Sequence, residues 1–161
     1  MAPWWVVPAL ILTSLRTLYA LRPGYGKPCN LSLEPPLQQP LLAIVGPTAV
    51  GKTALGVALT HAFPLEIVSV DSRQVYRGMD IGTAKPTLSE QAQSLYCLID
   101  VADPDKEFSL AHYLELARTA IQSIYQRGRV PLLVGGTGQY LWALLEAWRV
   151  PSVPPDLRLR R

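Results

Sequence analysis

The segment GPTAVGKT at residues 46–53 constrains the fold more than any other part of the sequence. It satisfies the pattern GxxxxGK[ST] and stands between a short apolar run, LLAIV at 41–45, and a helix-favouring stretch, TALGVALTHAF at 53–63. Strand, glycine-rich loop and helix in this order form a phosphate-binding loop (P-loop), because backbone N–H groups and a helix N-terminus then face an anion. The sequence therefore predicts an α/β domain that binds a polyphosphate.

The residues of this loop have distinct chemical roles. Gly46 and Gly51 allow the backbone to turn so that its N–H groups face phosphate oxygens. Lys52 is expected to neutralise the terminal phosphate, and Thr53 is expected to ligate Mg²⁺. The candidate phosphate-binding residues are Gly46, Pro47, Thr48, Ala49, Val50, Gly51, Lys52 and Thr53. The motif predicts a polyphosphate and Mg²⁺ but does not specify a nucleotide.

Apolar runs alternate with helix-favouring segments after the loop. Further strands are expected at EIVSV (66–70), YCLID (96–100) and VPLLV (130–134). One helix is expected to begin after Ser109 and end at Gly128, and another is expected in QYLWALLEAW (139–148). Because this alternation lacks hairpin signals, the sequence predicts an α/β, P-loop NTPase-like fold, in which helices cover both faces of a parallel sheet.

Carboxylates follow two of these strands, at the sheet edge where the loop is expected. Asp71 is interpreted either as a general base or ligand of a magnesium-bound water, or as a helix N-cap, for which Asp followed by Ser is well suited. Asp100 is the competing carboxylate for a metal role. Thr137, in the turn GGTG (135–138), either donates to an anionic ligand or belongs to an ordinary turn. The sequence alone does not define a functional role for Lys85. The alternative to a functional role is that Lys85 is a solvated loop lysine.

Charge and proline content divide the chain into three parts. Residues 41–150 carry 9 basic and 10 acidic side chains, whereas residues 1–40 carry 3 and 1, and residues 151–161 carry 3 and 1. Seven of the 15 prolines precede Leu41 and three follow Val150. The prediction is an irregular leader and linker outside the fold at 1–40, a P-loop core at 41–150, and the start of a further region at 151–161. The net charge of +3 is therefore poor evidence that the core binds a polyanion.

The leader does not have the pattern of a membrane span or a secretory signal. Its first uncharged run contains Pro8 and ends at Arg16, short of the roughly 18–20 apolar residues that cross a bilayer. No basic segment precedes that run and no small-residue cleavage site follows it. Stable membrane association is therefore not expected. An organellar targeting segment and a misassigned start stay open as interpretations.

Four segments together are much more specific than the loop alone. They are GPTAVGKT (46–53), VSVDSRQVYRGMDIGTAKP (68–86), LIDVADPDKEFSLAHY (98–113) and PLLVGGTGQYLWALL (131–145). Together they resemble the tRNA dimethylallyltransferases, over about residues 41–161. The resemblance implies transfer of the dimethylallyl group from dimethylallyl diphosphate to N6 of the adenosine on the 3′ side of the anticodon, giving N6-isopentenyladenosine. It also implies that the P-loop holds the donor's diphosphate with Mg²⁺, although such loops are often described as ATP-binding.

The resemblance assigns roles residue by residue. Asp71 matches the aspartate that accepts the N6 proton, and Thr137 matches a residue that contacts tRNA near the transferring group. The implied tRNA contacts are Asp71, Ser72, Arg73, Gln74, Thr137 and, through a one-residue gap, Arg158. The implied partner is the anticodon stem-loop of tRNA, whose substrate adenine has to leave the base stack to react. The protein is expected to be cytoplasmic and monomeric.

Departures from the family leave two alternatives. Family chains continue well beyond this point through a tRNA-binding insertion and a return segment, so the 161-residue chain is expected to bind diphosphate poorly and to modify tRNA barely or not at all. The first alternative is accordingly an inactive truncated fragment. The second is a small-molecule P-loop kinase, but such kinases need an arginine-bearing lid, and Arg127 and Arg129 precede the fourth strand. Smaller departures are Tyr96 and Cys97, where relatives often have histidine, and Gln139, where leucine is usual.

Overall fold

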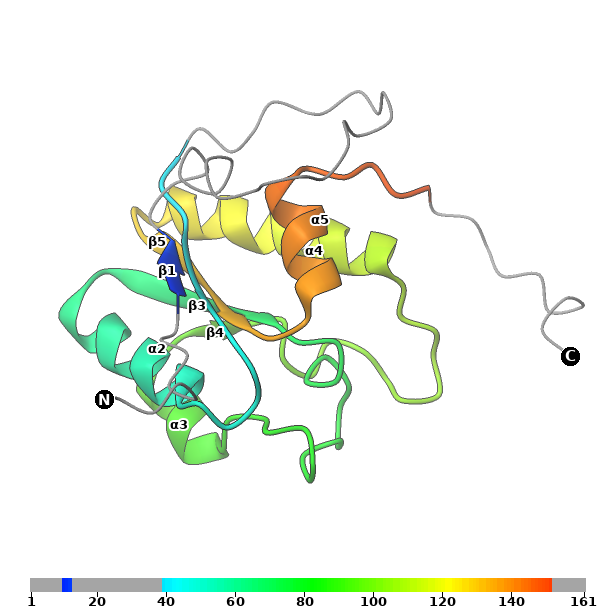
Figure 1. The fold of residues 1–161 in the computed structure, drawn as a ribbon, viewed down its shortest axis with the longest axis horizontal. Coiled ribbons are helices and arrows are strands. Elements are labelled where there is room, and N and C mark those ends of the chain that lie inside the picture. Colours follow the sequence, from blue (N-terminus) through cyan, green and yellow to red (C-terminus); the bar gives the residue numbers. More distant parts are fainter. Residues whose placement is uncertain (1–9, 13–38, 152–161) are drawn as a thin grey trace, which may run out of the picture.

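The computed structural model describes residues 10–12 and 39–151, which form a five-stranded sheet with helices packed on both faces (Figure 1). The strand order is β1-β2-β5-β3-β4, and all neighbouring pairs are parallel except β1 with β2. The elements are β1 (Leu10–Leu12), β2 (Leu42–Val45), α2 (Lys52–Ala62), β3 (Leu65–Val70), α3 (Leu88–Gln93), β4 (Tyr96–Cys97), α4 (Leu110–Gln126), β5 (Val130–Gly135) and α5 (Gly138–Leu145). The α/β prediction is confirmed.

The buried strands separate two apolar layers, because successive side chains of a strand point to opposite faces of the sheet. In β3, Val68 and Val70 pack in the layer formed with α4 and α5. Ile67 faces the other way, into a smaller cluster against which Leu55 and Leu59 of α2 pack. The continuous apolar character of β3 and β5 therefore reflects burial on both faces.

Helix α4 begins where the sequence predicts, since the Ser109 side chain accepts a hydrogen bond from the backbone N–H of His112. Its apolar face includes Tyr113, which is fully buried and donates its hydroxyl to the carbonyl of Ser69 at 3.1 Å. The Tyr113 ring also stacks on Tyr140 of α5, with ring centroids 4.0 Å apart. These contacts hold α4 and α5 against the carboxyl half of β3, beside Asp71.

Residues 1–40 are expected from the sequence to lie outside the fold, and the structure differs from this expectation at Leu10–Leu12. These residues pair antiparallel with β2, with Ile11 opposite Ile44. The physical reason is that β2 would otherwise present an edge of unpaired N–H and C=O groups, which any extended segment can satisfy. Residues 1–9 and 13–38 lie outside the described residues, as do residues 152–161. Within the described part, no helix is both long and apolar enough to cross a membrane.

The strand predicted at 96–100 is shorter than expected, since β4 contains only Tyr96 and Cys97. Leu98 and Asp100 take left-handed backbone conformations, with φ of 66° and 56°, which a strand cannot continue through. The structure also contains α3, a helix that is absent from the elements predicted above. Its signal is present in the sequence, because Thr87 and Glu90 form a capping box at its start.

Candidate functional site

The parallel strands end at one level, and this register assembles the site. Val45 of β2 and Val70 of β3 both pair with Gly135 of β5. The chain leaves each strand directly into a functional segment: the P-loop after Val45, Asp71 after Val70, and the GGTG turn at the end of β5. The three segments therefore lie together at the carboxyl edge of the sheet, where open α/β sheets bind ligands.

The P-loop has the conformation that its glycines predict. Gly51 takes a left-handed φ of 85° immediately before α2, and Ala49 takes a φ of 67°. Helix α2 then begins at Lys52, so its unpaired N–H groups and the positive end of its dipole face the loop. This is the arrangement that binds phosphate oxygens in α/β proteins.

Lys52 turns back over the loop, and its ammonium donates to the carbonyl of Pro47 at 2.6 Å. Partial burial lowers the pKa of Lys52 below its ordinary value, and the charge of Asp71 opposes that shift. Lys52 and Asp71 are thus close enough to interact electrostatically across the site. A bound phosphate can replace the Pro47 carbonyl as the acceptor, which returns a stronger, charge-assisted hydrogen bond to the ammonium.

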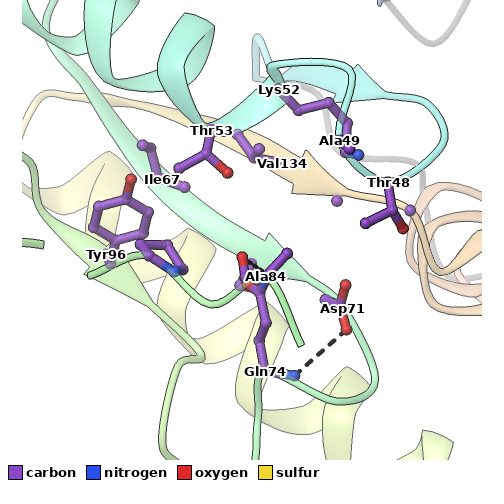
Figure 2. Close-up of a pocket in the computed structure, with 14 residues that line it drawn as sticks. Thr48, Ala49, Lys52, Thr53, Ile67, Asp71, Gln74, Ala84, Tyr96 and Val134 are labelled. Carbon is purple, nitrogen blue, oxygen red and sulfur yellow. Dashed lines mark hydrogen bonds between the residues drawn. The ribbon is translucent and has the colours of Figure 1, made fainter. Parts of the chain in front are cut away.

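A pocket opens between the P-loop and the Asp71 turn (Figure 2). Its lining combines polar and P-loop residues with apolar ones: Thr48, Ala49, Lys52, Thr53, Ser69, Asp71, Gln74, Gly135 and Gly136 on the one hand, and Ile67, Ala84, Pro86, Tyr96 and Val134 on the other. A pocket with a phosphate-binding wall and an apolar wall suits a ligand that has one anionic end and one hydrocarbon end.

Tyr96 is one of the residues that line the apolar side. Burial, aided by the charge of Glu90, raises the pKa of Tyr96 to about 12. Its hydroxyl is buried and has no hydrogen-bond partner among the described residues. In the sequence, Tyr96 stands out only as a departure from histidine, because nothing in the local pattern indicates that it lines the pocket.

Asp71 lines the pocket and also organises the turn that follows it. Its Oδ1 atom accepts hydrogen bonds from the backbone N–H groups of Arg73 at 2.9 Å and Gln74 at 3.4 Å. These bonds are those of a cap, but the segment is a series of turns and not the helix that the N-cap interpretation required. The carboxylate is therefore held by two amides, one of them drawn in Figure 2, and lines the same pocket as Lys52 and Thr53 of the P-loop.

The GGTG turn is tied to the Asp71 turn by Thr137. The Thr137 hydroxyl accepts a hydrogen bond from the backbone N–H of Ser72 at 2.9 Å, and its own N–H donates to the carbonyl of Val70 at 3.1 Å. A second cavity, of about 190 Å³, lies between this turn and the P-loop and is lined by Gly46, Pro47, Thr137 and Leu141 among others. Thr137 thus borders the P-loop side of the site as well as the Asp71 side.

The residues that the sequence assigned to tRNA contact are placed differently from one another. The Gln74 amide is engaged inside the protein, since it donates to the carbonyl of Ala84 at 2.9 Å and accepts from the Ser69 hydroxyl at 3.0 Å. Arg73 is exposed beside the pocket. Arg158 lies outside the described residues. The tRNA contacts of Ser72, Arg73, Gln74, Thr137 and Arg158 remain predictions.

Two sequence interpretations are corrected. Asp100 does not line the pocket; its carboxylate accepts a hydrogen bond from Lys85 at 2.7 Å, because the left-handed turn after β4 directs it there. Lys85 is not a solvated loop lysine, since its side chain is only 3% exposed.

Arg127 forms two hydrogen bonds with the buried carboxylate of Glu66, at the amino-terminal end of β3 and away from the P-loop edge.

Gly135 is required by the close approach of β5 to β3. A Cβ atom at this position would lie 2.1 Å from the carbonyl oxygen of Val70. We expect Gly135→Ala to separate the two strand ends and to lower the free energy of unfolding by about 3 kcal/mol, as overpacked buried sites do. Urea denaturation of the chain measures this change.

The matched control is Gly138→Ala, three residues along in the same turn. A Cβ atom there meets no atom within 4 Å, and the residue begins α5. This variant is expected to unfold at the same urea concentration as the parent or a higher one, because alanine favours helix over glycine. Equal effects of the two substitutions would contradict the strand-contact explanation for Gly135.

The pocket also offers oxygen ligands for a magnesium ion. The Thr53 hydroxyl and the Asp71 carboxylate line the same cavity. Mg²⁺ binds few protein oxygens and completes its shell with water and substrate phosphates. The residues present therefore fit this ion, and a magnesium site at Thr53 remains a prediction.

Comparison with known proteins identifies close relatives of this chain. A protein-family model described as IPP transferase matches residues 74–161, and one described as Isopentenyl transferase matches residues 39–100. The tRNA dimethylallyltransferase of Roseiflexus sp. (strain RS-1) is 66% identical over 121 residues, which are 75% of this chain and 40% of that protein. That of Chloroflexus aurantiacus (strain ATCC 29366 / DSM 635 / J-10-fl) is 63% identical over 120 residues, or 74% of this chain and 40% of that protein.

Solved structures give the same result. The full-length tRNA isopentenylpyrophosphate transferase from Bacillus halodurans is similar with a TM-score of 0.65 at 48% identity, over 73% of this chain and 39% of that chain. A eukaryotic dimethylallyltransferase that acts on tRNA has a TM-score of 0.62 at 30% identity, over 68% of this chain and 27% of that chain. This chain spans about 40% of the length of the two curated bacterial relatives. Because the first family model covers more than half of the chain, the chain belongs to the IPP transferase family.

Proposed function

We propose that this chain supplies the donor site and the catalytic carboxylate of a tRNA dimethylallyltransferase. The observation that carries the proposal is the pocket that places Lys52 and Thr53 of the P-loop opposite Asp71. Dimethylallyl diphosphate has the anionic end and the hydrocarbon end that the two sides of this pocket suit. The two curated relatives are tRNA dimethylallyltransferases, which supports tRNA as the acceptor substrate.

In the proposed reaction, N6 of an adenosine in the tRNA anticodon loop attacks the first carbon of the dimethylallyl group. The new N–C bond forms as the C–O bond to diphosphate breaks, and the N6 proton passes to the Asp71 carboxylate. An exocyclic adenine amine is a weak nucleophile, so removal of its proton by a positioned base favours attack. The diphosphate leaves with an additional negative charge, which Lys52 and the loop N–H groups stabilise.

Thr53 would hold Mg²⁺, which would supply further positive charge to the leaving diphosphate when bound. The adenine has to leave the base stack of the anticodon loop to reach a donor held in a protein pocket. Arg73, exposed at the edge of the pocket, is suited to contact the tRNA there, together with Ser72 and Thr137. We assign the reaction to the cytoplasm, with a protein that acts as a monomer.

A kinase acting on a small molecule is the competing function. It needs arginines over the phosphates, and the structure gives Arg127 and Arg129 another role, beside Glu66 at the amino-terminal end of β3. A nucleotide bound in the P-loop is therefore less well supported than a prenyl diphosphate.

The test is a chimaera in which this chain's matched segment replaces the 121 corresponding residues of the Roseiflexus relative. Labelled dimethylallyl diphosphate and labelled ATP are supplied separately with an anticodon stem-loop RNA. We expect label from the prenyl donor to appear in the RNA, and no transfer from ATP. A chimaera that folds but transfers only from ATP would contradict the proposal.

A further inference from the structure

Lys85 is a buried lysine at the centre of a polar cluster beside the candidate site, and the two carboxylates of that cluster are partly exposed. Its ammonium donates to the carbonyl of Tyr76 at 2.8 Å and to the carboxylates of Asp80 at 2.6 Å and Asp100 at 2.7 Å. An ammonium has three N–H donors, so these bonds satisfy it fully. Burial lowers the pKa of Lys85, but its hydrogen bonds to Asp100 and Asp80 outweigh burial and raise the pKa. The side chain is therefore cationic at neutral pH.

These bonds connect three segments of the chain, one of which is the loop that holds Lys85 itself. Tyr76 lies in the turns that follow Asp71, Asp80 belongs to the same loop before α3 as Lys85, and Asp100 follows β4. The first and third segments also bond directly, since the N–H of Asp100 donates to the carbonyl of Gln74 at 3.2 Å. Lys85 joins all three through its ammonium, and Gln74 adds bonds between them through its amide and its carbonyl.

The same cluster reaches the candidate base through Gln74. The Gln74 side chain donates to the carbonyl of Ala84, the residue before Lys85, and its backbone N–H donates to the Asp71 carboxylate. Ala84 and Asp100 both take left-handed conformations, with φ of 51° and 56°. Non-glycine residues persist in such conformations only where the surrounding contacts impose them. Lys85 directly follows Ala84 and donates to the side chain of Asp100, so its contacts act on both of these residues, together with those of Gln74.

We propose that Lys85 is a positioning residue for Asp71. By joining the three segments, it fixes the turn whose N–H groups hold the Asp71 carboxylate toward Lys52 and Thr53. Its effect on proton transfer rests on the proposed function, whereas its effect on the Asp71 turn does not. A purely structural lysine would stabilise the whole chain without a specific effect at this turn.

The first test measures amide hydrogen exchange by NMR in the 161-residue chain and its Lys85→Met variant. We expect about tenfold faster exchange at Gln74, whose N–H donates to Asp71, and at Asp100, whose N–H donates to Gln74, with no change at Leu133 in the core. The matched control is Lys106→Met, which removes an exposed lysine from an ion pair with Asp103. Asp100→Asn, which keeps an oxygen acceptor, is expected to have the same pattern with a smaller effect and provides the test if Lys85→Met does not fold.

Unchanged exchange at Gln74 and Asp100, or equal acceleration at Leu133, would overturn the proposal.

The second test uses the chimaera, where Lys85→Met is expected to lower kcat about tenfold with an unchanged KM for dimethylallyl diphosphate, as misplacement of a catalytic group does. A parallel rise in KM would also overturn it. If the parent chimaera transfers no prenyl group, the proposed function fails, and the exchange experiment still decides whether Lys85 positions Asp71.

Discussion

Replacing Asp71 with asparagine is expected to lower the rate of prenyl transfer by roughly 10²- to 10⁴-fold, the range that general-base catalysis contributes. Asparagine keeps an oxygen that can accept the N–H groups of Arg73 and Gln74, so the turn should persist. What is lost is the negative charge that accepts the N6 proton. Single-turnover transfer to an anticodon stem-loop, measured in the chimaera, gives the rate directly.

Measuring donor affinity distinguishes the loss of the catalytic base in Asp71→Asn from damage to the donor pocket. The affinity of Asp71→Asn for dimethylallyl diphosphate is expected to stay close to that of the parent, because the proposed contacts to the diphosphate come from Lys52 and the loop N–H groups. Asp105→Asn, a change of the same kind at an exposed residue, is the matched control. Full transfer rate in Asp71→Asn would mean that another group accepts the proton.

Replacing Lys52 with methionine is expected to weaken binding of dimethylallyl diphosphate by about 10- to 100-fold, the effect of losing hydrogen bonds from a charged donor. Methionine retains the apolar stem but cannot donate to phosphate. In the free protein the Lys52 ammonium donates to the carbonyl of Pro47. The substitution therefore removes this one loop contact from the free protein and the hydrogen bond to phosphate from the bound protein. Isothermal titration of the chimaera with the donor measures the change.

Inorganic pyrophosphate provides the internal comparison for Lys52. If the lysine contacts the diphosphate and not the hydrocarbon end, Lys52→Met should weaken pyrophosphate and prenyl donor binding by the same factor. Lys106→Met, which removes an exposed lysine elsewhere, should leave both affinities unchanged. A loss confined to the prenyl donor would place Lys52 beside the hydrocarbon and would contradict its role at the diphosphate.

The sequence predicts the P-loop well because its chemistry is local. Gly51 and Lys52 have their positions dictated by eight consecutive residues and by the strand and helix that flank them. Asp71 is also predictable as a residue of the site edge, since it directly follows a strand buried on both faces. Local pattern therefore specifies which side chains reach the carboxyl edge of the sheet.

Long-range pairing is what the local pattern does not contain. The insertion of β5 between β2 and β3 gives Val45 and Val70 a common partner in Gly135, and nothing near these residues in the sequence specifies that order. The burial of Lys85 likewise depends on Asp100, fifteen residues away in the sequence. A lysine in a loop is ordinarily solvated, and only the folded arrangement supplies three acceptors around this one.

The most direct test of the donor site is an NMR titration of the isotopically labelled chain with dimethylallyl diphosphate in the presence of Mg²⁺. We expect the largest amide shifts at residues 48–53 and at Asp71, and we expect that equimolar ATP does not reverse them. Shifts confined to other parts of the chain, or full displacement of the prenyl donor by ATP, would contradict the assignment of this pocket to a prenyl diphosphate.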